Sequence, residues 1–459
     1  MANLQNEKAT QHEQVGFKES VKQSTEGLQE SLDKLIRVGG FDLLEATVEG
    51  IQNLNPERKA RKQIFLTDDQ KKREREQLKK KMQLWVDILE SSESVSTMVD
   101  KSAEKLQAAE KNLNENIAKA LETTRDLEQA YRSVHLFYKN TEADKLQNVV
   151  LMNASMDQLT DLDNPRFIEY VSNEFKQNYD RLDLRDNYSL LVIPGYLGSN
   201  KVVDRWGKIA HQNKAMLITD FVDLDQPDDV VDLFTSANLT SADPHKANVI
   251  MTTNWMVGRE RVAEVGEEEN LTVPGSAALA GKMYYTLMSQ VTAGKKHGTI
   301  NEVDGVRFDL KKSEISHLER LGLVPMVNEY GKVMAFSAKT LFNGDNIGLQ
   351  TYSVVRVFDY VTKVLFDFLN RRAFENWTTK TEKDLRGQIV KFLDGIQGPD
   401  RLIERFKIMR FERDEVNKDK IHLDIHIVPY FPAKSFMVKL DGYKGEDEST
   451  TWNSEYAQQ

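Results

Sequence analysis

The stretch from Tyr188 to Val222 constrains the fold of this chain more than any other. It reads YSLLVIPGYLGSNKVVDRWGKIAHQNKAMLITDFV. An apolar, β-rich run is followed by residues with helical spacing and then by a second apolar run, which predicts a strand, a helix and a strand. Two strands joined by a helix lie parallel in one sheet. The segment therefore predicts a mixed α/β domain built on a parallel sheet.

Further apolar runs extend this pattern in both directions. LQNVVLMNAS (146–155) predicts another strand, and HKANVIMTTNWMV (245–257) predicts a buried strand or the start of a helix. LGLVPMVNEYGKVMAFSAKTLF (321–342) predicts two strands joined as a hairpin at residues 329–331. Beyond residue 350, two amphipathic helices are expected over 351–377 and 384–398, and strands follow them.

Charge and composition exclude several classes of protein. The net charge of −10 argues against a general nucleic-acid binder, because phosphate binding needs concentrated positive charge. The chain has no cysteine, which excludes disulfides and thiolate metal sites and fits a reducing compartment. No apolar run reaches 18 residues, and the first residues do not resemble a secretory signal. We therefore expect a cytoplasmic protein.

A heptad pattern runs through the helical N-terminal region. Six residues recur every seven positions and form one apolar stripe on a long helix. Two interpretations remain open: a helix packed on its own core, which is favoured because the second heptad position is often small or polar, or a coiled-coil seam with a partner. The stripe consists of Val99, Leu106, Leu113, Ala120, Leu127 and Val134, with Ile117 among the residues beside it.

Near the C-terminus, IHLDIHIVPYF (421–431) alternates apolar and polar residues, which predicts a half-buried strand. The face opposite the apolar residues carries His422, Asp424 and His426. The two histidines are four residues apart, about 13 Å along a strand, which is too far for both to reach one ion at about 2.1 Å. We therefore favour a face that meets water or a partner protein over a metal site.

Two other segments could carry chemistry, and each has a simpler explanation. The turn VIPGYLGSNK (192–201) lies between a strand and a helix, as phosphate-binding loops do, but it matches neither glycine-rich signature. A solvated loop with a helix cap is the favoured interpretation of the acidic segment after the next strand. No nucleophile elbow or HExxH zinc motif is present. The acidic residues are Asp220, Asp223, Asp225, Asp228 and Asp229.

Three stretches resemble a known family when they are taken in order. They are residues 127–159, residues 188–224 and LDIHIVPYFPAKSFMVKL (423–440). Their order and pattern are similar to those of the large contractile-sheath subunit of type VI secretion systems, the TssC/VipB family. The chain departs from that family at Tyr131, where tryptophan is usual, and in the PGYLG turn. The basic N-terminal region and the acidic loop 264–270 have no evident counterpart in the family. It therefore resembles a divergent subtype.

This resemblance implies a structural subunit and no enzyme, metal or cofactor. Such a subunit pairs with a small sheath subunit of the TssB/VipA type, and the pairs stack with further copies around an Hcp-like inner tube. The sheath stands on a baseplate, contracts to propel the tube, and is recycled by a ClpV-like AAA+ ATPase. Neither nucleic acid nor membrane insertion is implied. A nucleotide-binding α/β protein or enzyme that uses the turn at 193–201 is the alternative.

The resemblance also implies an α+β or mixed α/β organisation with strand exchange between subunits. We expect a helical arm over 1–62, a donated strand and long helices that pack on the small subunit over 63–144, a middle α/β domain over 145–350, a C-terminal tail-sheath domain with an intermolecular sheet over 351–445, and a loose polar tail over 446–459. The expected interface residues are Gln63, Ile64, Phe65, Leu66 and Thr67 in the donated strand, Leu106, Leu113 and Ile117 on the long helix, and Ile421, Leu423, Ile425, Ile427, Phe436 and Val438 in the C-terminal strands.

Overall fold

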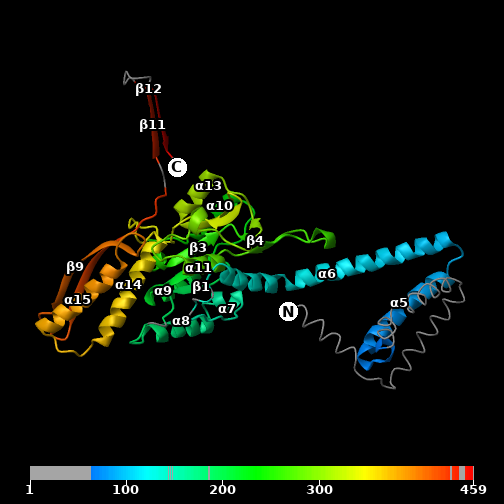
Figure 1. Cartoon of the computed structure of the whole chain (residues 1–459), viewed down its shortest axis with the longest axis horizontal. Helices are drawn as coiled ribbons and strands as arrows, with labels where there is room; N and C mark the ends of the chain where they lie inside the picture. Colours follow the sequence, from blue (N-terminus) through cyan, green and yellow to red (C-terminus); the bar gives the residue numbers. More distant parts are fainter. Residues whose placement is uncertain are drawn as a thin grey trace, which may run out of the picture. The chain divides into compact units, whose positions relative to one another are not determined.

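The computed structural model contains two compact units, Met1–Ala118 and Lys119–Gln459 (Figure 1). Within the described part of the chain, no helix is long and apolar enough to cross a membrane. The expected helical arm over residues 1–62 lies outside the described residues, as do Gln63 and Phe436. The structure describes residues 64–142, 144, 146, 148–184, 187–434, 437–443 and 450–457.

In the first unit, the prediction of a strand at 63–67 is wrong for the four residues that the structure describes. Residues 64–67 are helical, and the amide of Asp68 donates to the carbonyl of Ile64 at 2.9 Å. The buried guanidinium of Arg75 donates to the carbonyls of Phe65 and Asp68 at 2.7 and 2.6 Å and holds this turn in place. Asp68 then caps the next element by accepting from the amide of Gln70 at 2.9 Å.

Long helices follow this turn. The 3₁₀ turn η2 (Asp69–Lys71) leads into α5 (Lys72–Glu90) and then into α6 (Val95–Lys139). With 45 residues, α6 is about 67 Å long, and the boundary between the two units falls within it. The prediction of a long helix across the heptad stripe is confirmed.

The second unit is built on a five-stranded sheet in the order β1-β2-β3-β7-β8. The first four strands are parallel, and β8 returns antiparallel to β7. Helix α9 (Asn200–Gln212) connects β1 to β2, which confirms the predicted strand, helix and strand. Tyr330 and Gly331 have φ angles of 56° and 70° and close the predicted β7–β8 hairpin. The strands are β1 (Leu190–Val192), β2 (Met216–Asp220), β3 (Val249–Thr253), β7 (Leu323–Glu329) and β8 (Lys332–Ala335).

Helices bury both faces of this sheet, which explains its continuous apolar strands. Leu217 points into one buried cluster, whereas its neighbours Met216 and Ile218 point into a second cluster on the opposite face. The first cluster includes residues of α8 (Arg166–Tyr179), α9, α10 (Pro227–Ala237) and α13 (Lys312–Leu321). The second includes residues of α11 (Ser276–Tyr285), of the start of α14 (Tyr352–Arg371) and of the end of α6.

Short elements complete this body. A three-stranded antiparallel sheet has the order β5-β4-β6. The elements are α7 (Met156–Thr160), the 3₁₀ turns η4 (Pro244–Asn248) and η5 (Ala263–Val265), β4 (Met256–Arg259), β5 (Leu271–Val273), α12 (Gly294–His297) and β6 (Gly305–Val306).

The strand predicted over residues 146–155 does not form in the part of that run that the structure describes. The described residues of that run, 146 and 148–155, have no assigned secondary structure. Val150 and Leu151 are exposed. β-Branched side chains favour a strand, but a strand also needs a neighbouring strand to complete its hydrogen bonds.

The C-terminal region has its own core and two separate β-ribbons. The third buried cluster joins Val357 and Val361 of α14 to residues of α15 and β9. β9 pairs with β10, and β11 pairs with β12, both antiparallel. The expectation of a loose tail over 446–459 is wrong for residues 450–457, which form β12. These elements are α15 (Thr379–Ile396), β9 (Ile403–Arg413), β10 (Ile421–Pro429), β11 (Met437–Tyr443) and β12 (Thr450–Ala457).

Candidate assembly interface

The β9–β10 ribbon has one apolar face, as the alternation of the sequence predicted. Leu423, Ile425 and Ile427 pack against the third core cluster. Ile421, at the first position of β10, is exposed instead of packed. The strand and its inward face are therefore confirmed, with Ile421 as the exception.

The opposite face of β10 carries the two histidines and the carboxylate. His422 Nε2 lies 2.7 Å from Asp414 Oδ2, and Asp414 also accepts from the amides of Val416 and Asn417 at 2.9 and 2.7 Å. The hydrogen bond from His422 lowers the pKa of Asp414 to about 2. Asp424 and His426 are exposed. His422 therefore fastens the β9–β10 turn, and no group of three or more metal-ligating side chains exists among the described residues.

Both edges of this ribbon lack a strand partner in the part of the chain that the structure describes. β9 has eleven residues and β10 has nine. Long unpaired edges can accept a strand from another chain through main-chain hydrogen bonds. Within the single chain, β10 and β11 belong to different sheets. Val438, in β11, pairs with Tyr456 of β12.

The apolar stripe of α6 is exposed. Leu106 and Leu113 are 59% and 58% exposed, and Ile117 is 38% exposed. Leu127 and Tyr131, further along the same helix, are also exposed. The favoured interpretation of the heptad pattern, a helix packed on its own core, is therefore wrong for these residues. The alternative, a seam for a partner, agrees with their exposure.

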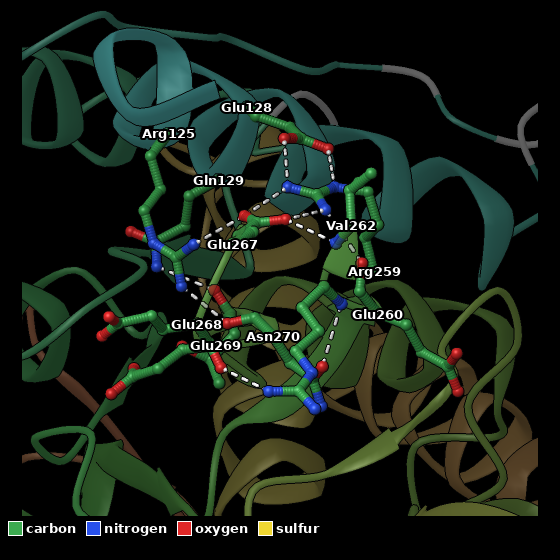
Figure 2. Close-up of polar contacts among 12 residues, drawn as sticks. Arg125, Glu128, Gln129, Arg259, Glu260, Val262, Glu267, Glu268, Glu269 and Asn270 are labelled. Carbon is green, nitrogen blue, oxygen red and sulfur yellow. Dashed lines mark hydrogen bonds and ion pairs between the residues drawn. The ribbon is translucent and has the colours of Figure 1, made fainter. Parts of the chain in front are cut away.

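An ionic cluster that sequence reasoning missed joins α6 to the β4–β5 hairpin (Figure 2). Glu128 accepts from Arg132 and Arg259 at 2.9 and 3.1 Å. Glu267 lies 3.1 Å from Arg125 and 2.7 Å from Arg259. We call these five side chains the hairpin clamp. The acidic loop 264–270, in which the chain departs from the family it resembles, therefore contributes Glu267 to the contact with α6.

Further hydrogen bonds to the hairpin backbone accompany the hairpin clamp. Arg125 donates to the carbonyl of Asn270 at 2.6 Å, and Arg132 donates to that of Gly258 at 2.7 Å. Gln129 donates to the carbonyl of Thr272 at 2.8 Å. The sequence signal was the spacing of Arg125 and Arg132, seven residues apart on one helix face, but nothing in the sequence identified their acidic partner.

The carboxylates of the hairpin clamp stay ionised well below neutral pH. A hydrogen bond from Arg259 lowers the pKa of Glu267 to about 2. Burial opposes ionisation of Glu128, yet hydrogen bonds from Arg259 and Arg132 hold its pKa below the ordinary value. The hairpin clamp is therefore fully charged at neutral pH.

The turn between β1 and α9 is already occupied by a carboxylate of the chain itself. Asp220 Oδ2 accepts from the amide of Gly195 at 2.9 Å, and Asp220 Oδ1 accepts from the amide of Ser276 at 2.8 Å and from the hydroxyl of Thr252. Burial raises the pKa of Asp220 to about 6. A phosphate at this turn would meet the Asp220 carboxylate, so the geometry disfavours nucleotide binding here.

The other acidic residues of that segment serve the fold. Asp223 accepts from the hydroxyl of Thr272 at 2.7 Å, and Asp225 pairs with Arg307. Asp228 and Asp229 lie in the first turn of α10, where the helix dipole favours negative charge. The expectation of a solvated loop holds for the exposed Asp225 and is wrong for Asp220, which is fully buried. The expected helix cap is not formed, because the N-cap residue Gln226 makes no side-chain hydrogen bond.

Comparison with known proteins gives a family for this organisation. The chain matches the family model "TssC/VipB-like, N-terminal region" over residues 28–117. It matches "Type VI secretion system TssC/VipB, central domain" over 119–343 and "TssC/VipB-like, C-terminal domain" over 351–458. A search of curated proteins found no match.

Solved structures of contractile particles are also similar to the chain. The anti-feeding prophage baseplate and its contracted helical sheath each have a TM-score of 0.47, with 17% and 18% identity, and cover 68% and 69% of this chain and 80% and 82% of theirs. The contracted sheath of the extracellular injection system PVC has a TM-score of 0.47 and 13% identity, and covers 70% of this chain and 81% of its own. At these scores, the assignment depends on the family models alone.

The three family models follow one another in chain order and belong to one protein family. Together they span both the helical N-terminal region and the C-terminal ribbons. The chain therefore belongs to the TssC/VipB family of type VI secretion systems.

Proposed function

We propose that this contractile sheath subunit assembles in the cytoplasm by strand exchange at the β9–β10 ribbon. Strands of a small TssB/VipA-like subunit and of neighbouring copies would extend the ribbon at its free edges. The β11–β12 hairpin would be the part of this chain that reaches a neighbour. The assembly would surround an Hcp-like tube, begin at a baseplate and be recycled by a ClpV-like ATPase, as the family resemblance implies.

The main support for this proposal is that both edges of the β9–β10 ribbon are free. One face of β9–β10 is fixed to the third core by Leu423, Ile425 and Ile427, so the ribbon is a firm template. Its long edges have no strand partner within the described chain. A main-chain ladder gives strength that depends little on side chains, and this suits a contact that must persist while rings rotate against each other.

The exposed stripe of α6 is the proposed contact for the small subunit. Its leucines recur every seven residues and are more than half exposed at Leu106 and Leu113. A partner helix with matching apolar positions would cover them as in a coiled coil. On this proposal the chain carries out no reaction, and the energy for contraction is stored in the extended lattice.

The test is negative-stain electron microscopy of the full chain produced together with the proteins encoded beside it. Hollow tubes with cogwheel-shaped ends are expected. Small uniform particles with every neighbour tried would contradict the proposal. A nucleotide-binding assay on the turn at 193–201 would then be the next experiment.

A further inference from the structure

Helix α14 carries a charged residue at every fourth position along one face. Residues four apart lie one above the other on a helix, so their side chains form a single row about 18 Å long. The signs alternate along the row. We call these four side chains the α14 charge row, and each of them contacts a residue outside the helix. The row consists of Asp359, Lys363, Asp367 and Arg371.

The first member of the row bonds to the central body between α9 and β3. Asp359 accepts from Asn248 Nδ2 at 2.7 Å and lies 3.7 Å from Lys214 Nζ. Asn248 also donates to the carbonyl of Ala215 at 3.0 Å, and its Oδ1 lies 2.7 Å from His211 Nδ1. These contacts hold the amide of Asn248 in one orientation. The site on the body is therefore built to receive a negative charge.

The next two members bond to the segment that joins α8 to β1. Lys363 donates to Asn187 Oδ1 and to the carbonyl of Tyr188, both at 2.8 Å. Asp367 accepts from the amide of Leu184 at 3.0 Å. The lysine thus meets two acceptors and the carboxylate meets a donor. The pattern of donors and acceptors on the segment matches the alternation of sign on the helix.

The last member of the row lies at the end of the helix. Arg371 lies 2.6 Å from Asp367 and 3.7 Å from Asp183. Its neighbour Asn370 donates to the carbonyl of Leu182 at 3.5 Å. As α14 advances toward its C-terminus, its partners on the segment therefore run in the opposite direction.

Burial opposes the charges in the first half of the row. It lowers the pKa of Lys363 to about 8 and raises the pKa of Asp359. Replacing buried charges with apolar side chains of similar volume is often neutral or stabilising, so such groups are weak evidence for stability. Their best attested use is to select one register between two packed elements.

A shift of α14 by one turn would bring groups of like character together. In one direction, Asp367 would face the carbonyl of Tyr188. The same shift would place Lys363 against Lys214. The opposite shift would place Asp367 against Asp183. Apolar packing is not directional and would resist such a shift less, so the charge row disfavours both neighbouring registers more strongly than the core does.

The position of α14 determines where the β9–β10 ribbon lies. Tyr352, in the first turn of the helix, packs in the second buried cluster, which belongs to the body. Val357 and Val361 pack in the third cluster, against which Ile425 of β10 also packs. The helix therefore connects the central sheet to the ribbon, and a shift of the helix on the body would move the ribbon with it.

We propose that the α14 charge row fixes the register of α14 on the central body and thereby sets where the free edges of the β9–β10 ribbon lie. The first part of this inference concerns the single chain alone. The second part rests on the proposed function, because strand exchange needs each edge at a fixed place for the neighbouring copy.

Cysteine crosslinking measures the register directly, because the chain has no cysteine of its own. Asn370 contacts Leu182, so L182C and N370C should be joined within one chain by a short bismaleimide. Phe366 is exposed one turn earlier on α14, so L182C with F366C reports a register shifted by one turn. Mass spectrometry of the monomer measures both yields. The first pair should give the higher yield, and equal yields would overturn the proposal.

Apolar replacement of the two middle members tests the charge row itself. K363M/D367L should lower the ratio of the first yield to the second at least about tenfold, as loss of a hydrogen bond to a charged group does. The matched control K391M/D394L makes the same kind of change at two exposed positions of α15 and should keep the ratio. An unchanged ratio in K363M/D367L would overturn the proposal and show that these residues serve the fold alone.

A milder variant keeps the test decisive if K363M/D367L does not fold. R371Q changes the end of the row, where the side chain is half exposed, so the chain should stay folded. The yield ratio should fall in the same direction but by less. The same ratio as in the unmodified chain would overturn the proposal.

Sheath formation separates this inference from the proposed function. Produced with the proteins encoded beside it, K363M/D367L should form fewer tubes than K391M/D394L in negative-stain electron microscopy. A lowered yield ratio with normal tubes would overturn the link between the charge row and the ribbon edges. Absence of tubes from the unmodified chain would refute the proposed function, and the yield ratio would still decide whether the row fixes the register.

Discussion

The central sheet and the β9–β10 ribbon differ in the length of their edge strands. The central sheet ends in β1, with three residues, and β8, with four. The ribbon has edges of eleven and nine residues along β9 and β10. Short edge strands are a common protection against unwanted pairing, whereas long edges invite it. This difference supports the proposal that the ribbon, unlike the central sheet, accepts strands from other chains.

The largest effect is expected from a proline substitution in the β9–β10 ribbon. I425P removes a ladder donor from the middle of β10, where Ile425 pairs with Ile408. Assembly into sheaths should be abolished, while the body over residues 145–350 stays folded. Deletion of residues 420–440 should have the same effect. Electron microscopy measures assembly, and limited proteolysis with mass spectrometry measures folding of the body.

The control for this variant is I421P. Ile421 is the first residue of β10, a position where proline is tolerated. Sheaths should therefore form in this variant. Intact sheaths from I425P would refute strand exchange at β10, and loss of the body from I425P would show that the ribbon and the body fold as one unit.

The next largest effect is expected from a substitution in the hairpin clamp, which should change the stability of the central body. E267Q removes the charge that meets Arg125 and Arg259, and it should lower the free energy of unfolding by about 1–3 kcal/mol at neutral pH. The folded pKa of about 2 lies below the ordinary value of about 4.3. The stabilisation is therefore complete above about pH 4.3 and is lost as the pH falls toward 2.

Thermal unfolding from pH 7 to pH 2 measures this difference between E267Q and the unmodified chain. The gap in unfolding temperature should narrow as the pH falls below about 4. E268Q is the matched control, because Glu268 is exposed in the same loop. A gap that does not change with pH would mean that Glu267 stabilises the hairpin by packing and not by charge.

A substitution in the α6 stripe should weaken partner binding and leave stability nearly unchanged, in contrast to one in the hairpin clamp. L113Q replaces an exposed leucine with a good helix former, so the free energy of unfolding should change by no more than about 0.5 kcal/mol. Binding of the small subunit should weaken, and analytical ultracentrifugation of the pair measures it. N112Q, beside the stripe, should bind normally. If both variants bind the small subunit equally well, the stripe is not part of the interface.

The sequence was most informative where pattern and burial agree. Leu217 and Ile218 are neighbours in an apolar run, and a strand that is buried on both faces needs such a run. The alternation of Leu423, Ile425 and Ile427 likewise predicted a strand with one packed face. In both cases, local periodicity decides which face each side chain meets.

Features that depend on distant or absent partners could not be read from the sequence. Glu267 meets Arg125 across 142 positions, and no local pattern marks that pairing. Residues 148–155 have strand-forming side chains but no neighbouring strand among the described residues. Residues 64–67 are also β-prone, yet Arg75 holds them in a helical turn.

The smallest predicted effect compares two helical glycines, one in each region. Gly281, in α11 of the body, has no room for a side chain, because a Cβ would lie 2.3 Å from the carbonyl oxygen of Phe137. Gly387, in α15, would meet nothing within 4 Å. G387A should therefore stabilise the isolated chain by about 0.5–1 kcal/mol, since alanine favours a helix, whereas G281A should destabilise it. Chemical denaturation measures both changes. If G387A stabilises the chain but impairs sheath formation, this glycine is required by a neighbouring subunit, as we propose for the free edges of the ribbon. If sheath formation is unaffected, the interface of the C-terminal region does not include this face of α15.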